Sequence, residues 1–386
     1  MTFRAFGAAA LFAFALAAPA AADETANFVV QLGQDTVSVE RVTRSASRVD
    51  VNQVGRAPRV LGRHFVYDYQ AGVISHVSLV VTPPGSTTPT QTIEATFDAD
   101  SMRMKIQSGT APAQNLHVAM PKGTVVLSTS SPWAAYESQT MKLMKGKSDS
   151  LRTTMYLLGA DNAMWLSLHK LGRDSVLIAN EHLDVFHAKV DAAGHLLGVL
   201  PISGTGKFSV TRVAQLDVPA MAAAFAAREQ AGAGLGVLSP RDTVRVASAG
   251  GASLWIDYGR PGKRGRVVYG GVVPFGDVWR TGANAATQFK TDKPLAFGTT
   301  VVPAGFYTLW TVPSPNGWKL IVNSETGQWG TDHKADKDLV TIDMATSTLP
   351  QPVERFTISV EPSASGGVIH MDWDTTRASA AFTVQP

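Results

Sequence analysis

Turn signals interrupt this chain about every ten residues, and this spacing constrains its fold more than any other feature. Pro83-Pro84-Gly85, Asp98-Ala99-Asp100 and Asp191-Ala192-Ala193-Gly194 are three such signals. The segments between the turns are short, and several of them alternate apolar with polar residues, as Thr36–Val42 does. Strands this short and this frequent predict antiparallel sheets that are curved or partly closed.

One helix divides the strand-rich regions. Asp217 is a typical N-cap, Pro219 stands in the first turn, and an alanine-rich run continues to Ala231 before several glycines end it. We therefore expect a mainly β protein with two antiparallel β domains joined by one α-helix. The helix is a linker, or it also covers the open face of the first sheet as a lid. The expected parts are a curved sheet or half-barrel at 23–213, the linker helix with its Gly-rich tail at 214–237, and a β-sandwich at 238–386.

Residues 1–22 have the pattern of a secretory signal peptide. Arg4 supplies a positive charge, Ala8–Ala17 is apolar, and Ala20-Ala21-Ala22 fits the small-residue rule for cleavage. The apolar stretch is shorter than the roughly 20 residues that a membrane-spanning helix needs, so the pattern favours cleavage near Ala22 over an anchor. We expect a periplasmic or secreted protein with no transmembrane segment in the mature chain.

Composition and missing motifs exclude several kinds of chemistry. The chain has no cysteine, so disulfides, thiolate metal sites and cysteine nucleophiles are excluded. Its net charge of +3 is too small to indicate nucleic acid as a partner. The phosphate-binding loop, HExxH, GxSxG, dinucleotide-binding and EF-hand motifs are missing. We therefore expect no cofactor, and the motifs assign no catalytic residue.

Two histidine-containing clusters are candidates for cation sites, and the sequence favours neither. On a strand, His187 points to the face opposite His182 and Asp184, which is poor spacing for a shared metal. His333 lies among three aspartates, but lysines such as Lys334 are mixed with them, which favours a solvated loop. We expect no metal site.

The stretch Ile256–Thr287 combines arginine, tyrosine, tryptophan and asparagine with many glycines and prolines. Trp279 stands on a Gly-rich loop beside Arg280 and Asn284, and Trp329 stands on a similar loop. An aromatic ring in such a loop can stack on a sugar, base or peptide while the polar groups hydrogen-bond to the same ligand. The predicted ligand-binding residues are Tyr258, Arg260, Trp279, Arg280, Asn284 and Trp329.

Arg280 is the strongest single candidate. Because it follows Trp279, we expect it to be at least half buried, and a buried arginine needs carboxylate or carbonyl partners. Asp257, Asp277 and Glu325 are the acids available nearby in the sequence. Two interpretations stay open: an Arg–Asp pair that fixes the loop, and a bidentate anchor for an anionic or carbonyl-bearing ligand.

Several motifs occur together in the second half of the chain. They are Asp257-Tyr258-Gly259-Arg260-Pro261, Arg264-Gly265-Arg266, Tyr269-Gly270-Gly271-Val272-Val273-Pro274, Val278-Trp279-Arg280-Thr281-Gly282-Ala283-Asn284, Gln328-Trp329-Gly330 and Trp373-Asp374-Thr375-Thr376. With these motifs, the region from about Leu238 to Val384 resembles the DUF2911 family, secreted bacterial proteins without an assigned activity. The resemblance implies a fold and a location but no catalytic roles.

The first domain is loosely similar to the curved sheets of periplasmic lipoprotein-handling proteins. In such folds a half-closed sheet capped by a helix shelters an apolar ligand. The similarity concerns architecture, so it supports a function only by analogy.

Three functions stay open at this point. The first is a non-enzymatic binding module of the bacterial cell envelope, with a glycan, peptide or lipid as ligand. The second is a hydrolase-like enzyme with a site around Arg280, Asp257 and His333, which requires these groups within hydrogen-bond reach of one substrate. The third is a purely structural interaction module, in which the predicted binding residues hold long loops together.

Overall fold

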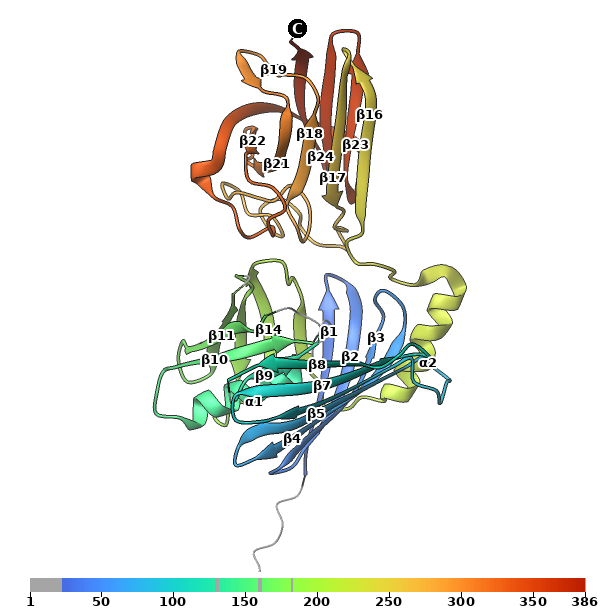
Figure 1. Ribbon diagram of the computed structural model, residues 1–386, viewed down its shortest axis with the longest axis vertical. Coiled ribbons are helices and arrows are strands. Elements are labelled where there is room, and N and C mark those ends of the chain that lie inside the picture. The colour runs from blue at the N-terminus through green and yellow to red at the C-terminus, as the bar shows by residue number, and fades with distance from the viewer. Residues whose placement is uncertain (1–22, 122, 129–131, 159–161, 182, 386) are drawn as a thin grey trace, which may run out of the picture.

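The computed structural model describes residues 23–121, 123–128, 132–158, 162–181 and 183–385. The expected signal peptide and His182 lie outside these ranges. The fold is mainly β, as the turn spacing predicts, and consists of a 15-stranded sheet, a nine-stranded sheet and few helices (Figure 1).

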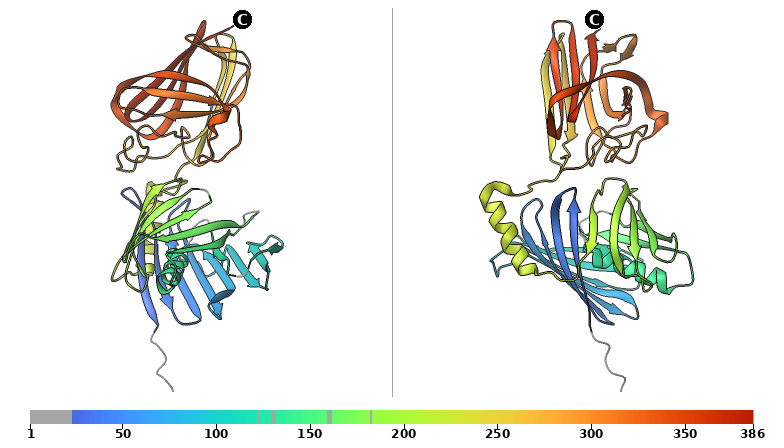
Figure 2. Two further views of the ribbon diagram at one scale, coloured as in Figure 1. Left: turned by 90° about the vertical axis from the view of Figure 1, so that its left-hand side faces the viewer. Right: turned by 180° about the vertical axis from the view of Figure 1, so that it is seen from behind.

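The first domain is built on one continuous sheet. Its strands are β1 (Glu24–Leu32), β2 (Asp35–Arg44), β3 (Arg48–Gly55), β4 (Leu61–Gln70), β5 (Val73–Thr82), β6 (Gln91–Phe97), β7 (Ser101–Ser108), β8 (Gln114–Ala119), β9 (Val125–Leu127), β10 (Ser150–Leu157), β11 (Met164–Lys170), β12 (Ser175–Asn180), β13 (Val185–Val190), β14 (Leu196–Ser203) and β15 (Ser209–Arg212). The strand order is β8-β7-β6-β5-β4-β3-β2-β1-β15-β14-β13-β12-β11-β10-β9, and the β9–β10 pair is parallel whereas the other pairs are antiparallel. The sheet is strongly curved (Figures 1 and 2).

Helix α1 (Trp133–Lys145) lies on the inner face of this curved sheet. Its residues Trp133 and Leu143 are buried in the same apolar cluster as Phe28, Phe65 and Leu166 from the strands. Trp133 also packs edge-on against an aromatic ring of β13, with the ring centroids 5.6 Å apart. The main core of the first domain therefore lies between the inner face and α1.

Helix α2 (Val218–Arg228) begins where the sequence predicts. The Asp217 carboxylate accepts a hydrogen bond from the Ala220 N–H at 2.9 Å. Phe225 of α2 packs with Val39 and Val54 in a smaller cluster, separate from the main core, so α2 lies on the outer face of β2 and β3 (Figure 2). The helix that covers the inner face is α1, and α2 leads to the second domain through a π-helical turn, η1 (Glu229–Ala233).

The second domain contains the nine-stranded sheet. Its strands are β16 (Arg241–Ala249), β17 (Ala252–Gly259), β18 (Thr287–Thr291), β19 (Leu295–Phe297), β20 (Thr300–Val302), β21 (Gly305–Val312), β22 (Trp318–Asn323), β23 (Asp338–Ser363) and β24 (Gly366–Val384), and η2 (Ala335–Lys337) is a short 3-10 turn. The order is β16-β17-β18-β21-β22-β23-β24-β19-β20. The sequence predicts a sandwich of two layers, and in the structure both layers belong to one sheet. The long strand β23 joins them, because its first part pairs with β22 and the rest pairs with β24.

The alternation of apolar and polar residues predicts two short strands within each of these two elements: Leu339–Met344 and Arg355–Glu361 in β23, and Gly367–Trp373 and Ala378–Val384 in β24. The structure joins each pair, because β23 and β24 stay paired across register shifts around Val353. Among the described residues, no helix is long and apolar enough to cross a membrane.

Candidate functional site

The start of α1 is held by a residue from β2. Pro132 precedes the helix and offers no capping side chain. Instead the carboxyl group of Glu40 accepts hydrogen bonds from the N–H groups of Trp133 (2.7 Å) and Ala134 (3.3 Å) and from the Gln53 side chain (3.2 Å). Burial raises the pKa of Glu40 to about 8, against the opposing effect of these hydrogen bonds.

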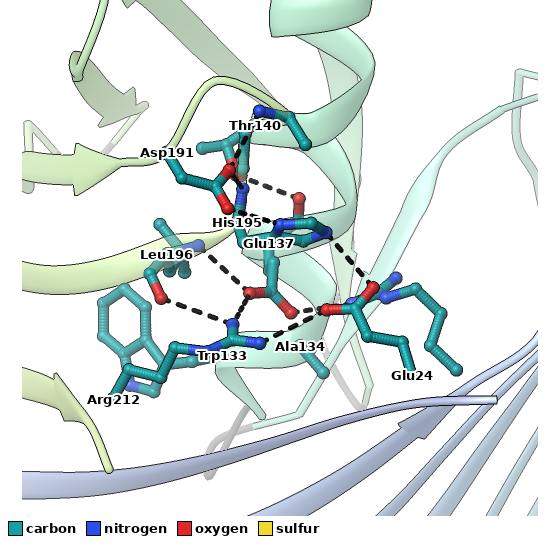
Figure 3. A network of polar contacts seen from close by, with 12 residues as sticks. Glu24, Trp133, Ala134, Glu137, Thr140, Asp191, His195, Leu196 and Arg212 are labelled. Atoms are coloured by element: carbon teal, nitrogen blue, oxygen red, sulfur yellow. Dashed lines mark hydrogen bonds and ion pairs between the residues drawn. The ribbon is translucent and has the colours of Figure 1, made fainter. Parts of the chain in front are cut away.

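The middle of α1 is held by Glu137, whose side chain is 0 % exposed. Its carboxylate accepts hydrogen bonds from Arg212 (2.6 Å) and from the Leu196 N–H (3.0 Å) (Figure 3). It also accepts a hydrogen bond from Arg44 (2.9 Å). Arg212 also pairs with Glu24 at 3.2 Å. Two guanidinium groups offset the cost of burying one carboxylate, so the helix is tied to β2, β14 and β15 through a single side chain.

A third contact brings the backbone of the helix against the turn before β14. The Thr140 hydroxyl donates to the Gly194 carbonyl at 2.6 Å. Gly194 has φ +91°, and a Cβ there would lie 2.6 Å from the Met141 Cα. Only glycine fits this close approach, so the turn and the helix are fixed relative to each other.

A cleft of about 640 Å³ lies between α1 and strands β2 to β5. This volume falls in the range of roughly 300–1,000 Å³ that is typical of small-molecule sites. Its apolar wall is formed by Val49, Tyr69, Val73, Ile74 and Met141. Its polar side chains are those of Arg44, Ser45, Ser138, Gln139, Lys142 and Lys145.

The polar groups of the cleft differ in whether they already have hydrogen-bond or ion-pair partners within the protein. Arg44 is occupied, because it donates to the Ser138 hydroxyl at 2.8 Å as well as to Glu137. Lys142 and Lys145 lie in the last turn of α1, and no described carboxylate pairs with either of them. The cleft therefore combines an apolar wall with two ammonium groups at the C-terminal end of the helix.

Two of the predicted binding residues connect β17 to β23. Tyr258 is 1 % exposed, and its hydroxyl donates to the Ile358 carbonyl (3.4 Å) and accepts from the Ile358 N–H (3.0 Å). Arg260 donates to the Phe356 carbonyl (3.2 Å), to Asp242 (3.0 Å) and to the Thr357 hydroxyl (3.0 Å). These contacts favour a role in holding the domain together for both residues.

Trp279 is likewise part of the core of the second domain. It is 7 % exposed, and its indole N–H donates to the Gly282 carbonyl at 3.1 Å. Its ring stacks on Trp373, with centroids 5.9 Å apart, and meets Phe356 edge-on at 5.0 Å. Such aromatic packing stabilises the loop that carries the neighbouring Arg280.

Arg280 has a different environment. Its side chain runs directly beneath Gly330, where a Cβ would collide with it, and its Nε is shielded from solvent without a hydrogen-bond partner. Burial lowers the pKa of Arg280 to about 10, so the guanidinium stays charged at neutral pH. Asn284 is exposed, with its carbonyl accepting from the Gly330 N–H at 2.9 Å, and Trp329 is next in sequence to Gly330. The structure thus brings Arg280, Asn284 and Trp329 together around Gly330.

None of the acids expected near Arg280 forms an ion pair with it. Asp257 pairs with Arg241, Glu325 pairs with Lys334 at 2.6 Å, and Asp277 is exposed. The buried guanidinium therefore has no described carboxylate partner.

His333, the other member of the hydrolase hypothesis, is also engaged elsewhere. Its Nε2 lies 2.9 Å from Asp338 Oδ1, and its ring packs on Trp310 with centroids 4.9 Å apart. Within the described ranges, no three His, Cys, Asp or Glu side chains gather closely enough to hold a metal ion.

The cleft is the feature that sequence reasoning missed. The sequence pattern predicts no strand at Val49, which belongs to β3, and it indicates a helix that ends at Lys145 without assigning a function to it. One signal was available: Lys142 and Lys145 are three residues apart, which places them on one face of a helix.

Fold and cleft together define a two-domain β protein with a ligand-sized cavity in its first domain. Residues 239–382 match the family DUF2911, a protein of unknown function, so the resemblance of the second domain to this family is confirmed. No curated protein matches the chain. A crystal structure of a DUF1089 family protein from Pseudomonas aeruginosa is similar at 12% sequence identity and a TM-score of 0.32, covering 46% of this chain and 93% of that one.

Proposed function

We propose that this protein is a non-enzymatic binding protein of the bacterial cell envelope. Its first domain holds an amphipathic molecule, with an apolar chain and an anionic head, in the cleft beside α1. The observation that carries this proposal is a cleft of about 640 Å³ that has both an apolar wall and two ammonium groups, neither of which pairs with a carboxylate of the described residues. The envelope location rests on the signal-peptide pattern of residues 1–22.

The apolar wall supplies most of the binding free energy. A hydrocarbon chain of the ligand that covers Val49, Ile74 and Met141 gains roughly 25 cal/mol of binding free energy for each Å² of apolar surface removed from water. Lys142 and Lys145 are exposed, and an exposed ion pair contributes only about 0–1 kcal/mol. The affinity should therefore depend more on the length of the ligand's hydrocarbon chain than on the charge of its head group.

Contacts within the chain, made by Glu40, Glu137 and Thr140, hold α1 in place, so we infer that the cleft is preformed. A preformed site avoids the free-energy cost of ordering a helix on binding. We therefore expect binding without a large change in the structure of the first domain.

The test is a competition series with the mature chain and the fluorescent fatty acid cis-parinarate as probe. Octanoate, dodecanoate and hexadecanoate should compete with rising affinity, and hexadecanol should compete within about tenfold of hexadecanoate. The double variant Lys142→Gln/Lys145→Gln should lose the preference for the acid over the alcohol. The matched control is Lys105→Gln, an exposed lysine on β7, which should keep it.

The proposal fails if the probe does not bind, or if competition is independent of chain length. A wild-type preference for the acid that survives in the lysine double variant would remove the assigned role of Lys142 and Lys145.

A further inference from the structure

The two domains meet where the turn between β1 and β2 contacts a loop of the second domain. The Gln34 N–H donates to the Arg264 carbonyl at 3.0 Å, and Asp35 forms an ion pair with the Arg264 guanidinium at 2.5 Å. Gly33, with φ +62°, approaches Arg264 so closely that a Cβ would collide with its carbonyl. One end of the first sheet is thereby fixed against the second domain, as its turns face the loops of that domain (Figure 1).

Strand directions bring a second loop to the same junction. β1 and β14 are both antiparallel to β15, so they run in the same direction. The loop after β14, which includes Gly204 and Lys207, therefore emerges at the same end of the sheet as the β1–β2 turn. Two strand spacings separate the loop from the turn, which is about 10 Å.

Positive charge accumulates at this junction. Burial lowers the pKa of Lys207, and the charges of Arg280 and Arg266 lower it further, so these cations from the two domains lie close together. The charge of the nearby Asp184 carboxylate raises the pKa values of both Lys207 and Arg280, against the effect of burial. Its Oδ1 accepts hydrogen bonds from the N–H groups of Thr205 (2.5 Å) and Gly206 (2.9 Å).

Lys207 and Arg280 are both partly buried, and neither has an ion pair or a hydrogen bond from its side chain to a described residue. Partial removal of a cation from water without a partner is costly, and the Nε of Arg280 is fully shielded from solvent, so this pair indicates a place where an anion completes the structure. Guanidinium groups bind carboxylates and phosphates in a bidentate manner, and an ammonium adds a second point of contact.

We propose that the junction is a binding site for an anionic group, a carboxylate or a phosphate, held between Lys207 of the first domain and Arg280 of the second. Asn284 and Trp329 lie beside Arg280 and are placed to contact the rest of the molecule that carries the anion. This site is at the end of the sheet and is independent of the cleft beside α1.

The test is the thermal midpoint of the mature chain, measured against rising inorganic phosphate or succinate, with sodium chloride added to hold ionic strength constant. The wild type should show a saturable rise in midpoint. Lys207→Gln and Arg280→Gln should each weaken the apparent affinity at least about tenfold, the loss of one charged contact. The matched control is Lys189→Gln, an exposed lysine on β13, which should bind like the wild type.

A saturable effect of phosphate alone assigns the site to phosphate, and of succinate alone to carboxylate. The proposal is overturned if neither anion has a saturable effect, or if Lys207→Gln binds with wild-type affinity. Should Arg280→Gln fail to fold, Lys207→Gln decides alone. Fatty-acid binding by Lys207→Gln should be unchanged, so this result and that of the cleft experiment are separable.

Discussion

Glu137→Gln is the substitution that most sharply tests how α1 is held. The variant keeps the size of the side chain and an oxygen that can accept from the Leu196 N–H, which lies at 3.0 Å in the wild type. It removes the negative charge that both Arg44 and Arg212 contact. The perturbation is therefore the loss of charge in a buried ion network, without a cavity.

The magnitude follows from the burial of the three groups. The side chains of Arg44 and Arg212 are 13% and 21% exposed, against 0% for Glu137. Removing one partner of a buried ion pair costs about 3–5 kcal/mol. Arg212 keeps Glu24 at 3.2 Å, and both arginines reach some water. We therefore expect Glu137→Gln to lower the free energy of unfolding by about 3 kcal/mol, the lower end of this range.

Hydrogen exchange followed by mass spectrometry measures this loss directly, because peptides that span α1 report the free energy of opening of that region. The control is Glu94→Gln, since Glu94 is about half exposed and contacts His76 at 2.8 Å on the surface. The control should cost less than about 1 kcal/mol. A loss in α1 no larger than that of the control would refute the view that Glu137 anchors the helix.

Three further outcomes are expected. The folded-state pKa of Glu40 is raised from 4.5 to about 8, so the stability it contributes is fully present below about pH 4.5 and is lost as pH rises through about 8. Urea denaturation of the wild type and Glu40→Gln across this interval should show the wild type losing stability relative to the variant, and a pH-independent difference would contradict this. Gly194→Ala should destabilise the first domain by at least about 2 kcal/mol, because its Cβ would meet Met141 at a positive φ, and a melt within error of the wild type would refute that contact. Arg260→Ala should destabilise the second domain by about 2 kcal/mol, since Asp242 and two other acceptors lose their donor, while fatty-acid binding stays at the wild-type level; reduced fatty-acid binding would argue against a local structural role.

Local signals were sufficient to predict most of the fold. The turn spacing predicts short antiparallel strands, and Asp217 predicts the start of α2, because both depend on residues adjacent in the chain. The strand breaks expected within β23 and β24 are absent, since pairing between the two long strands outweighs local sequence preference.

The site was harder to predict, because the same residue types serve packing and binding. Tyr258, Arg260 and Trp279 were selected for their chemistry, but that chemistry is used inside the domain, in the case of Tyr258 with a residue 100 positions away. The cleft likewise depends on contacts between residues far apart in the sequence, since Glu40 caps a helix that starts 93 positions later. Of the two predicted binding residues that carry a charge, Arg260 is paired within the domain, whereas Arg280 has no described partner for its buried Nε, as an anchor for a ligand requires.

Calorimetric titration of hexadecanoate into the wild type and into Ile74→Trp tests the central claim most directly. Ile74 lines the apolar wall, and the larger indole should fill the cleft without removing any contact of α1. The account predicts one binding site in the wild type and a loss of affinity of at least about tenfold in the variant, with an unchanged thermal midpoint. Equal binding by both proteins, or no binding by the wild type, would contradict it.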